Sequence, residues 1–234
     1  YNVNPITNYL TGHKFEDDGG VTATAALNTA VAAWLSDSAA AEVTYGHIST
    51  WDTSLVTSFR DLFKDKANFN EDLSHWDTSA VTSTFRMFQA ASSFNGDIGN
   101  WDMSNNSKMN SMFYNAHSFN QPLNNWNVSK VLYMEAMFYN AESFNQPLNN
   151  WNVHLVQYMN SMFDGAHSFN QPLNPPPIGG WDVSSVLHMG VMFRSATDFN
   201  QDISTWNVSS GVNMVDMFDD AESFDLSYAP WYSG

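Results

Sequence analysis

The sequence predicts an α/β solenoid: an array of 25-residue strand–helix coils with an N-terminal helical cap. Three observations lead to this prediction. Tryptophan recurs at a constant spacing, other apolar residues keep the same spacing, and the segment before the first repeat carries a helical stripe. A period of this length is typical of proteins in which each unit buries its apolar face against its neighbours.

Eight tryptophans define the repeat. Neighbouring tryptophans are 25 residues apart, except for one step of 30. They are Trp51, Trp76, Trp101, Trp126, Trp151, Trp181, Trp206 and Trp231. Counted from each Trp, phenylalanine recurs at +12 and +18, as in Phe113 and Phe119, and methionine dominates +8 and +11. One apolar pattern therefore runs through the array.

Each repeat contains the pattern of a short strand followed by a helix. Leucine or isoleucine stands at −3, Trp at 0 and a further inward residue at +2, as in Leu148, Trp151 and Val153. This is the spacing of leucine-rich repeats. Serine at +3 in most coils, followed by apolar residues at +5, +8, +11 and +12, is typical of an N-cap and a helical stripe. The prediction is a right-handed, leucine-rich-repeat-like coil.

An N-terminal segment, 1–50, precedes the repeats. Four apolar residues within it recur at the spacing of one helix face. They are Leu27, Val31, Trp34 and Leu35. The sequence therefore predicts a capping helix at about 21–36 and then a lead-in coil, because an open array needs its first coil covered.

The seven coils are predicted to span 51–225 and to end in an aromatic cap at 226–234. The fifth coil is longer than the others because of a proline-rich insertion near 174–178. A run of prolines favours a stiff, extended loop. We expect this loop to bulge out of the stack and to leave the register of the coils intact.

Composition restricts the class of function. Acidic residues outnumber basic ones by 24 to 8, so the formal net charge is −16. Such a charge repels phosphate backbones and anionic lipids, so we expect no nucleic-acid partner. No apolar segment is long enough to predict direct membrane insertion. The chain has no cysteine, which excludes disulfides and thiol chemistry.

The repeat pattern F-N-x-x-[IL]-x-x-W-[DN]-x-S-x-V-x-x-M-x-x-M-F-x-x-A resembles the 25-residue lipoprotein repeats of mycoplasma surface proteins, which are related to the BspA-like class of leucine-rich repeats. The resemblance covers about residues 22–231; Asn106 and Gly211 depart from it at +5. It implies an extracellular or cell-surface setting, often within a larger surface protein. It implies no enzymatic activity, and some relatives are adhesins.

Polar side chains flank each Trp and form the candidate ligand-binding ladder. In a strand, positions −1 and +1 point away from the core. The ladder consists of His75, Asp77, Asn100, Asp102, Asn125, Asn127, Asn150, Asn152 and Asp182. Three interpretations apply to it. The +1 side chains accept backbone amides at a turn, or they form a polar concave face for a protein or glycan partner, or Asp52, Asp77 and Asp102 bind calcium.

A second cluster, His117, Glu142 and His167, stands at +16 of consecutive coils and has the side chains of a zinc site. Because other coils carry Ala, Ser or Thr there, we interpret it as a solvated ridge. Catalytic motifs are missing, and a glycosidase needs a unique carboxylate pair. Every ladder Asp is matched by Asn in another coil, which disfavours that pair.

The sequence therefore predicts a non-enzymatic recognition or adhesion module at the cell surface or outside the cell, without a cofactor. The first alternative is a calcium-binding structural spacer of a larger surface protein. The second is a carbohydrate-active enzyme. An ice- or mineral-binding surface ranks last, because mixed Asp, Asn, Thr and His make the face irregular.

Overall fold

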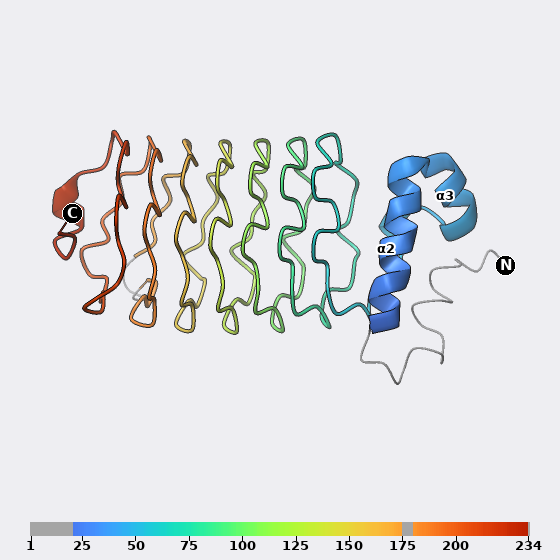
Figure 1. The fold of residues 1–234 in the computed structure, drawn as a ribbon, viewed down its shortest axis with the longest axis horizontal. Helices are drawn as coiled ribbons and strands as arrows, with labels where there is room; N and C mark the ends of the chain where they lie inside the picture. The colour runs from blue at the N-terminus through green and yellow to red at the C-terminus, as the bar shows by residue number, and fades with distance from the viewer. Residues whose placement is uncertain (1–20, 175–179, 234) are drawn as a thin grey trace.

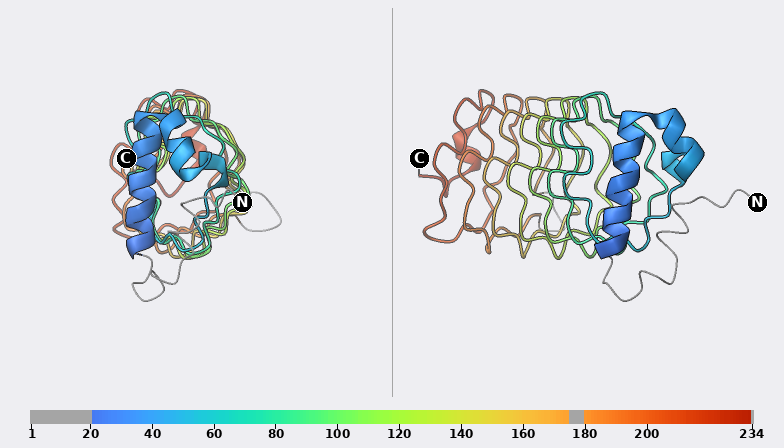
Figure 2. Two further views of the ribbon diagram at one scale, coloured as in Figure 1. Left: turned by 90° about the vertical axis from the view of Figure 1, so that its right-hand side faces the viewer. Right: turned by 45° about the vertical axis from the view of Figure 1, so that its right-hand side comes forward.

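The computed structural model describes residues 21–174 and 180–233. Seven coils are stacked along one axis, with the helical segment at one end and the C-terminal tail at the other (Figure 1). Viewed along this axis, the coils overlie one another (Figure 2). The first 20 residues, the prolines of the predicted insertion and the final Gly lie outside the described residues.

Two helices cover the first coil. The helix predicted at about 21–36 is present as α2 (Val21–Ser36), and α3 (Ser38–Tyr45) follows it directly. Asp37 separates them and caps α3, because its carboxylate accepts a hydrogen bond from the backbone N–H of Ala40 at 3.1 Å. A short 3₁₀ helix, η1 (Ile48–Thr50), leads into the first repeat.

Helix α2 is attached to the stack by its apolar stripe. Leu27 and Val31 are buried against the core. Trp34 meets Trp51 of the first coil edge to face, with ring centroids 5.9 Å apart. The hydroxyl of Thr24 accepts a hydrogen bond from the backbone N–H of Thr57 at 3.3 Å. The first coil therefore has a covered end.

The predicted α/β solenoid of leucine-rich-repeat-like strand–helix coils is wrong. Residues 101–103, where the strand was expected, have no regular structure, and 110–115, within the expected helix, form consecutive turns. The same assignment recurs in the other coils. Among the described residues, the only β structure is a series of isolated parallel bridges at +7, and both α-helices precede the coils.

The spacing of apolar residues explains this difference. The backbone N–H of Val131 donates to the carbonyl of Val128, and that of Met137 donates to Met134. Each bond closes a β-turn of four residues. Apolar residues at +2, +5, +8 and +11 therefore face inward from a succession of turns. Over so few residues, a spacing of three also resembles the stripe of a helix with 3.6 residues per turn.

Residues with a left-handed backbone conformation donate their N–H groups to the next coil. Positions +10 and +14 have positive φ although most are not glycine; Ser111 has φ of 56° and Asn115 of 55°. A positive φ at the third residue of a turn is a feature of type II turns. The N–H of Ser111 donates to the carbonyl of Glu135 at 2.8 Å, and that of Asn115 donates to Tyr139 at 2.7 Å.

Bonds between coils alternate with bonds inside a coil. At +8, +10, +12 and +14 the N–H of one coil donates to a carbonyl of the following coil, as Phe113 does to Met137 at 2.9 Å. At +11, +13 and +15 the N–H closes a turn within its own coil, as in Ala116 to Phe113. This alternation satisfies the buried backbone without a regular sheet.

Stacked aromatic rings fill the interior. The rings of Trp126 and Trp151 lie 6.4 Å apart with planes within 3°. Phe113 stacks on Phe119 of its own coil at 3.9 Å and on Phe138 of the next coil at 5.6 Å. The register of the coils continues across the insertion, since the parallel bridge there pairs Tyr158 with His188.

A ladder of asparagines at +19 joins the coils at their surface. The side-chain oxygen of Asn95 accepts a hydrogen bond from the backbone N–H of Asn120 at 2.9 Å, and Asn120 accepts in the same way from Asn145 at 3.0 Å. Side-chain amides of glutamine at +20 donate to the same oxygens, as Gln146 does to Asn120. These asparagines are therefore part of the scaffold.

The C-terminal tail covers part of the last coil. It contains the 3₁₀ helix η2 (Leu226–Tyr228). Trp231 then stacks on Trp206 at 5.9 Å, and Tyr232 meets Phe218 edge to face at 5.1 Å.

Candidate functional site

Parallel bridges hold the coils in register and turn each repeated position into a row along the stack. The bridged residues are Ser58, Ser83, Lys108, Tyr133, Tyr158, His188 and Asn213. Equivalent side chains of parallel, in-register segments lie about 4.8 Å apart from one coil to the next. A ligand that lies along the axis therefore meets the same chemistry several times.

The residues of the predicted ladder lie together on one such surface, the ladder edge, defined by positions −1 and +1. Asn100 and Asp102 are exposed, whereas Trp101 between them is buried. The other members repeat this arrangement, and each is exposed. These are His75, Asp77, Asn125, Asn127, Asn150, Asn152 and Asp182.

Side chains at +1 bond to their own backbone. The carboxylate of Asp102 accepts a hydrogen bond from the N–H of Ser104 at 2.9 Å, and the amide oxygen of Asn127 accepts one from Ser129 at 3.1 Å. Hydrogen bonds from the side chain and then the backbone of Ser104 lower the pKa of Asp102. Asp and Asn are interchangeable in this turn because each supplies one acceptor oxygen.

Side chains at −1 are less engaged. Those of Asn100 and Asn125 are exposed and form no hydrogen bond with another described residue, while Asn150 accepts from the side chain of Asn149 at 3.3 Å. The row is interrupted at Gly180, which has φ of 59°. The −1 amides are therefore the members of the ladder edge that can bond to a partner without disturbing a turn.

The three aspartates proposed for calcium have their side-chain oxygens in turns. Asp52 accepts from the N–H of Ser54 at 3.0 Å, and Asp77 accepts from both the N–H and the hydroxyl of Ser79. Across residues 21–174 and 180–233, no three His, Asp or Glu side chains converge on a point where a metal ion could bind.

Two side chains of the ridge at +16 lie close together. His117 Nδ1 lies 3.2 Å from Glu142, with both side chains about half exposed.

A second outward surface was not predicted from the sequence. Side chains at +7 and +9 flank the buried residue at +8 and face the same side, which we call the bridge face. Aromatic rings stack along its +7 row: Tyr133 lies 5.3 Å from Tyr158, and Tyr158 lies 5.3 Å from His188. The sequence signal for this face was the alternation of polar and apolar residues from +7 to +9, as in Lys108, Met109 and Asn110.

Two hollows lie on the bridge face. One, of about 420 Å³, surrounds Gly190, where the coil lacks a side chain at +9. The other, of about 290 Å³, is lined by charged, amide and aromatic side chains of the first four coils, and we call it the Glu135 hollow. Its residues are Arg60, Phe85, Lys108, Asn110, Tyr133 and Glu135.

Three stretches of the chain, 38–118, 98–176 and 174–233, match the family described as Mycoplasma protein of unknown function, DUF285. Together they cover most of the chain, from the start of α3 through the last coil. The chain belongs to the DUF285 family. No curated protein matches it. The relationship therefore lies in the repeats, and the description of the DUF285 family supplies no activity.

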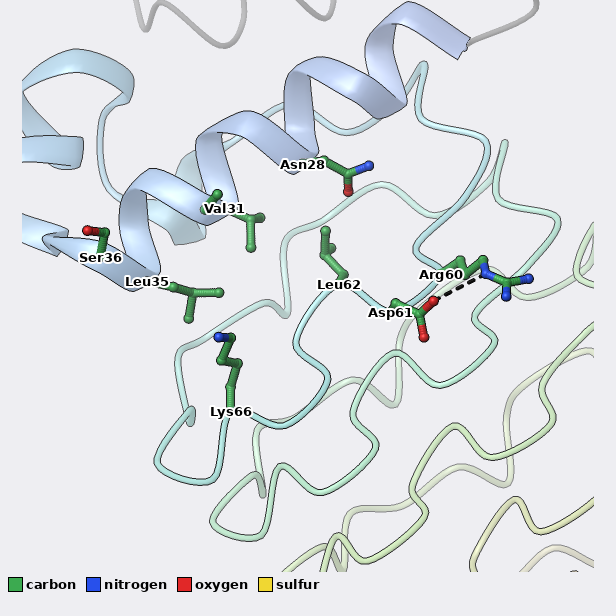
Figure 3. A pocket seen from close by; sticks show the side chains of 9 residues that line it. Asn28, Val31, Leu35, Ser36, Arg60, Asp61, Leu62 and Lys66 are labelled. Carbon is green, nitrogen blue, oxygen red and sulfur yellow. Dashed lines mark hydrogen bonds and ion pairs between the residues drawn. The ribbon is translucent and has the colours of Figure 1, made fainter.

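In this DUF285 chain a third concavity, of about 520 Å³, lies where α2 meets the first coil. Val31 and Leu35 from the helix face Leu62 from the coil, with Lys66 at one end and Arg60 at the other (Figure 3). None of the described helices could cross a bilayer, given their length and polarity.

Proposed function

We propose that this DUF285 chain is a non-enzymatic recognition or adhesion module that binds a protein or glycan partner through its ladder edge. One observation carries the proposal: exposed amides at −1, such as Asn100 and Asn125, repeat along a rigid stack and have no partner among the described residues. An amide offers two donors and an acceptor, which match sugar hydroxyls or a peptide backbone.

The fixed backbone of the ladder edge supports this proposal. The N–H of Trp101 donates to the carbonyl of Ile98 at 3.2 Å, and this bond closes the turn that contains Asn100. The N–H of Trp126 closes the same turn around Asn125. A preorganised surface loses less conformational entropy on binding than a mobile one. Repetition also allows several weak contacts to act together.

The proposed setting is extracellular or on a cell surface, as part of a larger surface protein. This follows the finer part of the resemblance, to BspA-like surface proteins, and it concerns only location and adhesive role. The strand–helix geometry of leucine-rich repeats does not apply to this chain.

Binding to a broad glycan array and to a panel of purified extracellular matrix proteins tests the proposal. The informative variant carries Asn100→Ala and Asn125→Ala; it should lose binding and melt at the same temperature as the parent. Asn127→Ala is the matched control, because it removes a turn acceptor and should lower the melting temperature. A parent protein that binds neither panel, or a double variant that binds normally, contradicts the proposal.

The same assays, run with calcium and with chelator, test the calcium-binding spacer. Binding of calcium to the folded chain through Asp52, Asp77 and Asp102 would raise the melting temperature as calcium increases. Binding to a partner that disappears in chelator would place calcium at the ladder edge. A melting temperature and partner binding that are both independent of calcium would contradict this alternative.

A further inference from the structure

The side chains that line the Glu135 hollow have a net positive formal charge, although the molecule as a whole is strongly acidic. Arg60 and Lys108 contribute two positive charges to its lining and Glu135 contributes one negative charge. The whole chain has a formal net charge of −16. Basic side chains collected around one hollow favour a ligand that carries negative charge.

Arg60 lines the Glu135 hollow and also one end of the concavity beside α2. Its guanidinium points away from α2, and its Nε donates to Asp61 at 3.2 Å (Figure 3). The guanidinium carbon lies 4.5 Å from the ring centroid of Phe85, a cation–π contact that restricts it further. The remaining N–H donors stay available, since the side chain of Arg60 is 59% exposed.

Lys108 stands on the backbone bridge of the third coil, which links Ser83 to Tyr133. Its side chain is exposed, and its ammonium group forms no ion pair with any described residue. A fixed backbone and an unpaired ammonium provide a positive charge that a ligand can neutralise.

Glu135 supplies an acceptor that the protein leaves unused. The side chain is half-buried: its Oε2 is closed to solvent, and the carboxylate accepts no hydrogen bond from any other described residue. Burial raises the pKa of this carboxyl. A ligand's hydroxyl group can donate to the exposed part of this carboxylate, since a carboxylate oxygen has more than one lone pair. Asn110 lies beside it with a further donor and acceptor.

Two rings complete the lining. Tyr133 offers part of its ring to the hollow, whereas the guanidinium carbons of Arg60 and Arg86 already lie 4.5 and 4.4 Å from the ring centroid of Phe85. The hollow is close in size to the smallest pockets that hold small ligands. A ligand that fits must combine an anionic group, hydroxyl groups and an apolar face. A sugar ring bearing an acidic group has all three. An amino acid fits less well, because Arg60 and Lys108 repel its ammonium group.

We propose that the Glu135 hollow binds an acidic saccharide, with the anionic group at Lys108 and Arg60 and a ring hydroxyl donating to Glu135. This inference rests on the proposed function, in that the recognition module takes a glycan, but it uses the bridge face and not the ladder edge. The anionic group can be a carboxylate or a sulfate, and the test separates the two.

The test is binding of the purified chain to an array of carboxylated, sulfated and neutral saccharides, followed by titration of the best binder. Lys108→Met should weaken binding about tenfold or more, since it removes one charge-assisted hydrogen bond. Lys130→Met is the matched control: it makes the same change of charge at an exposed site where the ammonium bonds to Asn105, and it should leave affinity unchanged. Glu135→Gln keeps an acceptor and removes a negative charge, so affinity should not fall.

Three outcomes would overturn the inference: an array on which no acidic saccharide binds, equal binding of neutral and acidic saccharides, or equal weakening by Lys108→Met and Lys130→Met. The variant with Asn100→Ala and Asn125→Ala separates this inference from the proposed function. Saccharide binding lost in that variant and kept in Lys108→Met places the ligand at the ladder edge. The reverse result places it in the Glu135 hollow and contradicts the role of the ladder edge in glycan binding.

Discussion

The side-chain oxygen of Asn145 accepts a hydrogen bond from the backbone N–H of Asn170 at 3.0 Å, across the boundary between two coils. It also accepts one from the side chain of Gln171 at 2.9 Å. Asn145→Ala should lower the free energy of unfolding by about 1–3 kcal/mol, because it leaves a backbone donor unsatisfied. Urea denaturation measures this change.

Gln171→Ala is the control for that prediction. It removes only the side-chain donor to Asn145 and leaves the backbone bond from Asn170 in place. The loss should stay below about 0.5 kcal/mol, as for most surface substitutions. Equal losses of stability in the two variants would show that the bond from the backbone of Asn170 to the side-chain oxygen of Asn145 does not stabilise the boundary between the coils.

The indole nitrogen of Trp126 donates to the carbonyl of Ile98 in the preceding coil at 2.9 Å, and this bond is buried. Trp126→Phe should lower the free energy of unfolding by about 2–4 kcal/mol, since it removes the donor and leaves a cavity. Trp231→Phe removes an equivalent bond to Ile203 at the half-exposed end and should cost less. A larger loss at Trp231 would contradict this account of the core.

Left-handed residues other than glycine carry backbone strain. Ala136 has φ of 51°. Ala136→Gly should raise the free energy of unfolding by about 0.5 kcal/mol, because relief of strain exceeds the extra entropy of the unfolded chain. Ala141 lies in the same coil, is buried and is not left-handed, so Ala141→Gly should destabilise. Thermal unfolding compares the two, and destabilisation by both would disprove the role of strain.

Stability should fall in acid. Hydrogen bonds from Ser104 lower the pKa of Asp102, and those from Ser184 lower the pKa of Asp182. A carboxyl whose pKa is lower in the folded chain stabilises it above about pH 4, and this contribution is lost as pH falls through the folded value. Asp102→Asn keeps the turn acceptor without titrating. Its urea midpoint should therefore fall less than the parent's between pH 5 and pH 2, and identical profiles would contradict the prediction.

Half-buried Glu135 and buried Asp164 affect the pH dependence of stability in the opposite direction. Burial raises the pKa of Glu135 and of Asp164, although Arg194 partly offsets the effect at Asp164. Their contribution is present below the unfolded pKa and is lost as pH rises through the folded value. Comparing Glu135→Gln with the parent isolates this effect, because the variant should lose less stability between pH 4 and pH 7.

The period of the repeat was readable from the sequence, but the local conformation was not. Tryptophans and phenylalanines at constant spacing indicate that coils stack, and the rings of Trp126 and Trp151 do so. The conformation depends on left-handed backbone at positions such as Ser111 and Val191, which are not residues that normally mark it. Bonds from these residues to the next coil override local propensity, and no single repeat contains that information.

The ladder edge was predicted from the sequence, and the bridge face was not. Exposed Asn100 and Asp102 alternate with buried Trp101 and Met103, as in a strand, although the segment has no regular structure. The bridge face was missed because the helical interpretation placed +7 and +9 on different sides of a helix. In the turns they share one side, and only then do Lys108 and Glu135 meet.

Backbone hydrogen bonds at +8, +10, +12 and +14 all run the same way along the stack. The N–H groups of each coil donate to carbonyls of its successor, as Phe138 does to Met162. Every internal coil thus presents to its successor the same set of donors and acceptors that its predecessor presents to it. A gene duplication of one whole repeat would therefore add a coil that fits both of its neighbours. The length of the array is therefore free to evolve in whole units, and relatives can differ in reach while they keep the same chemistry.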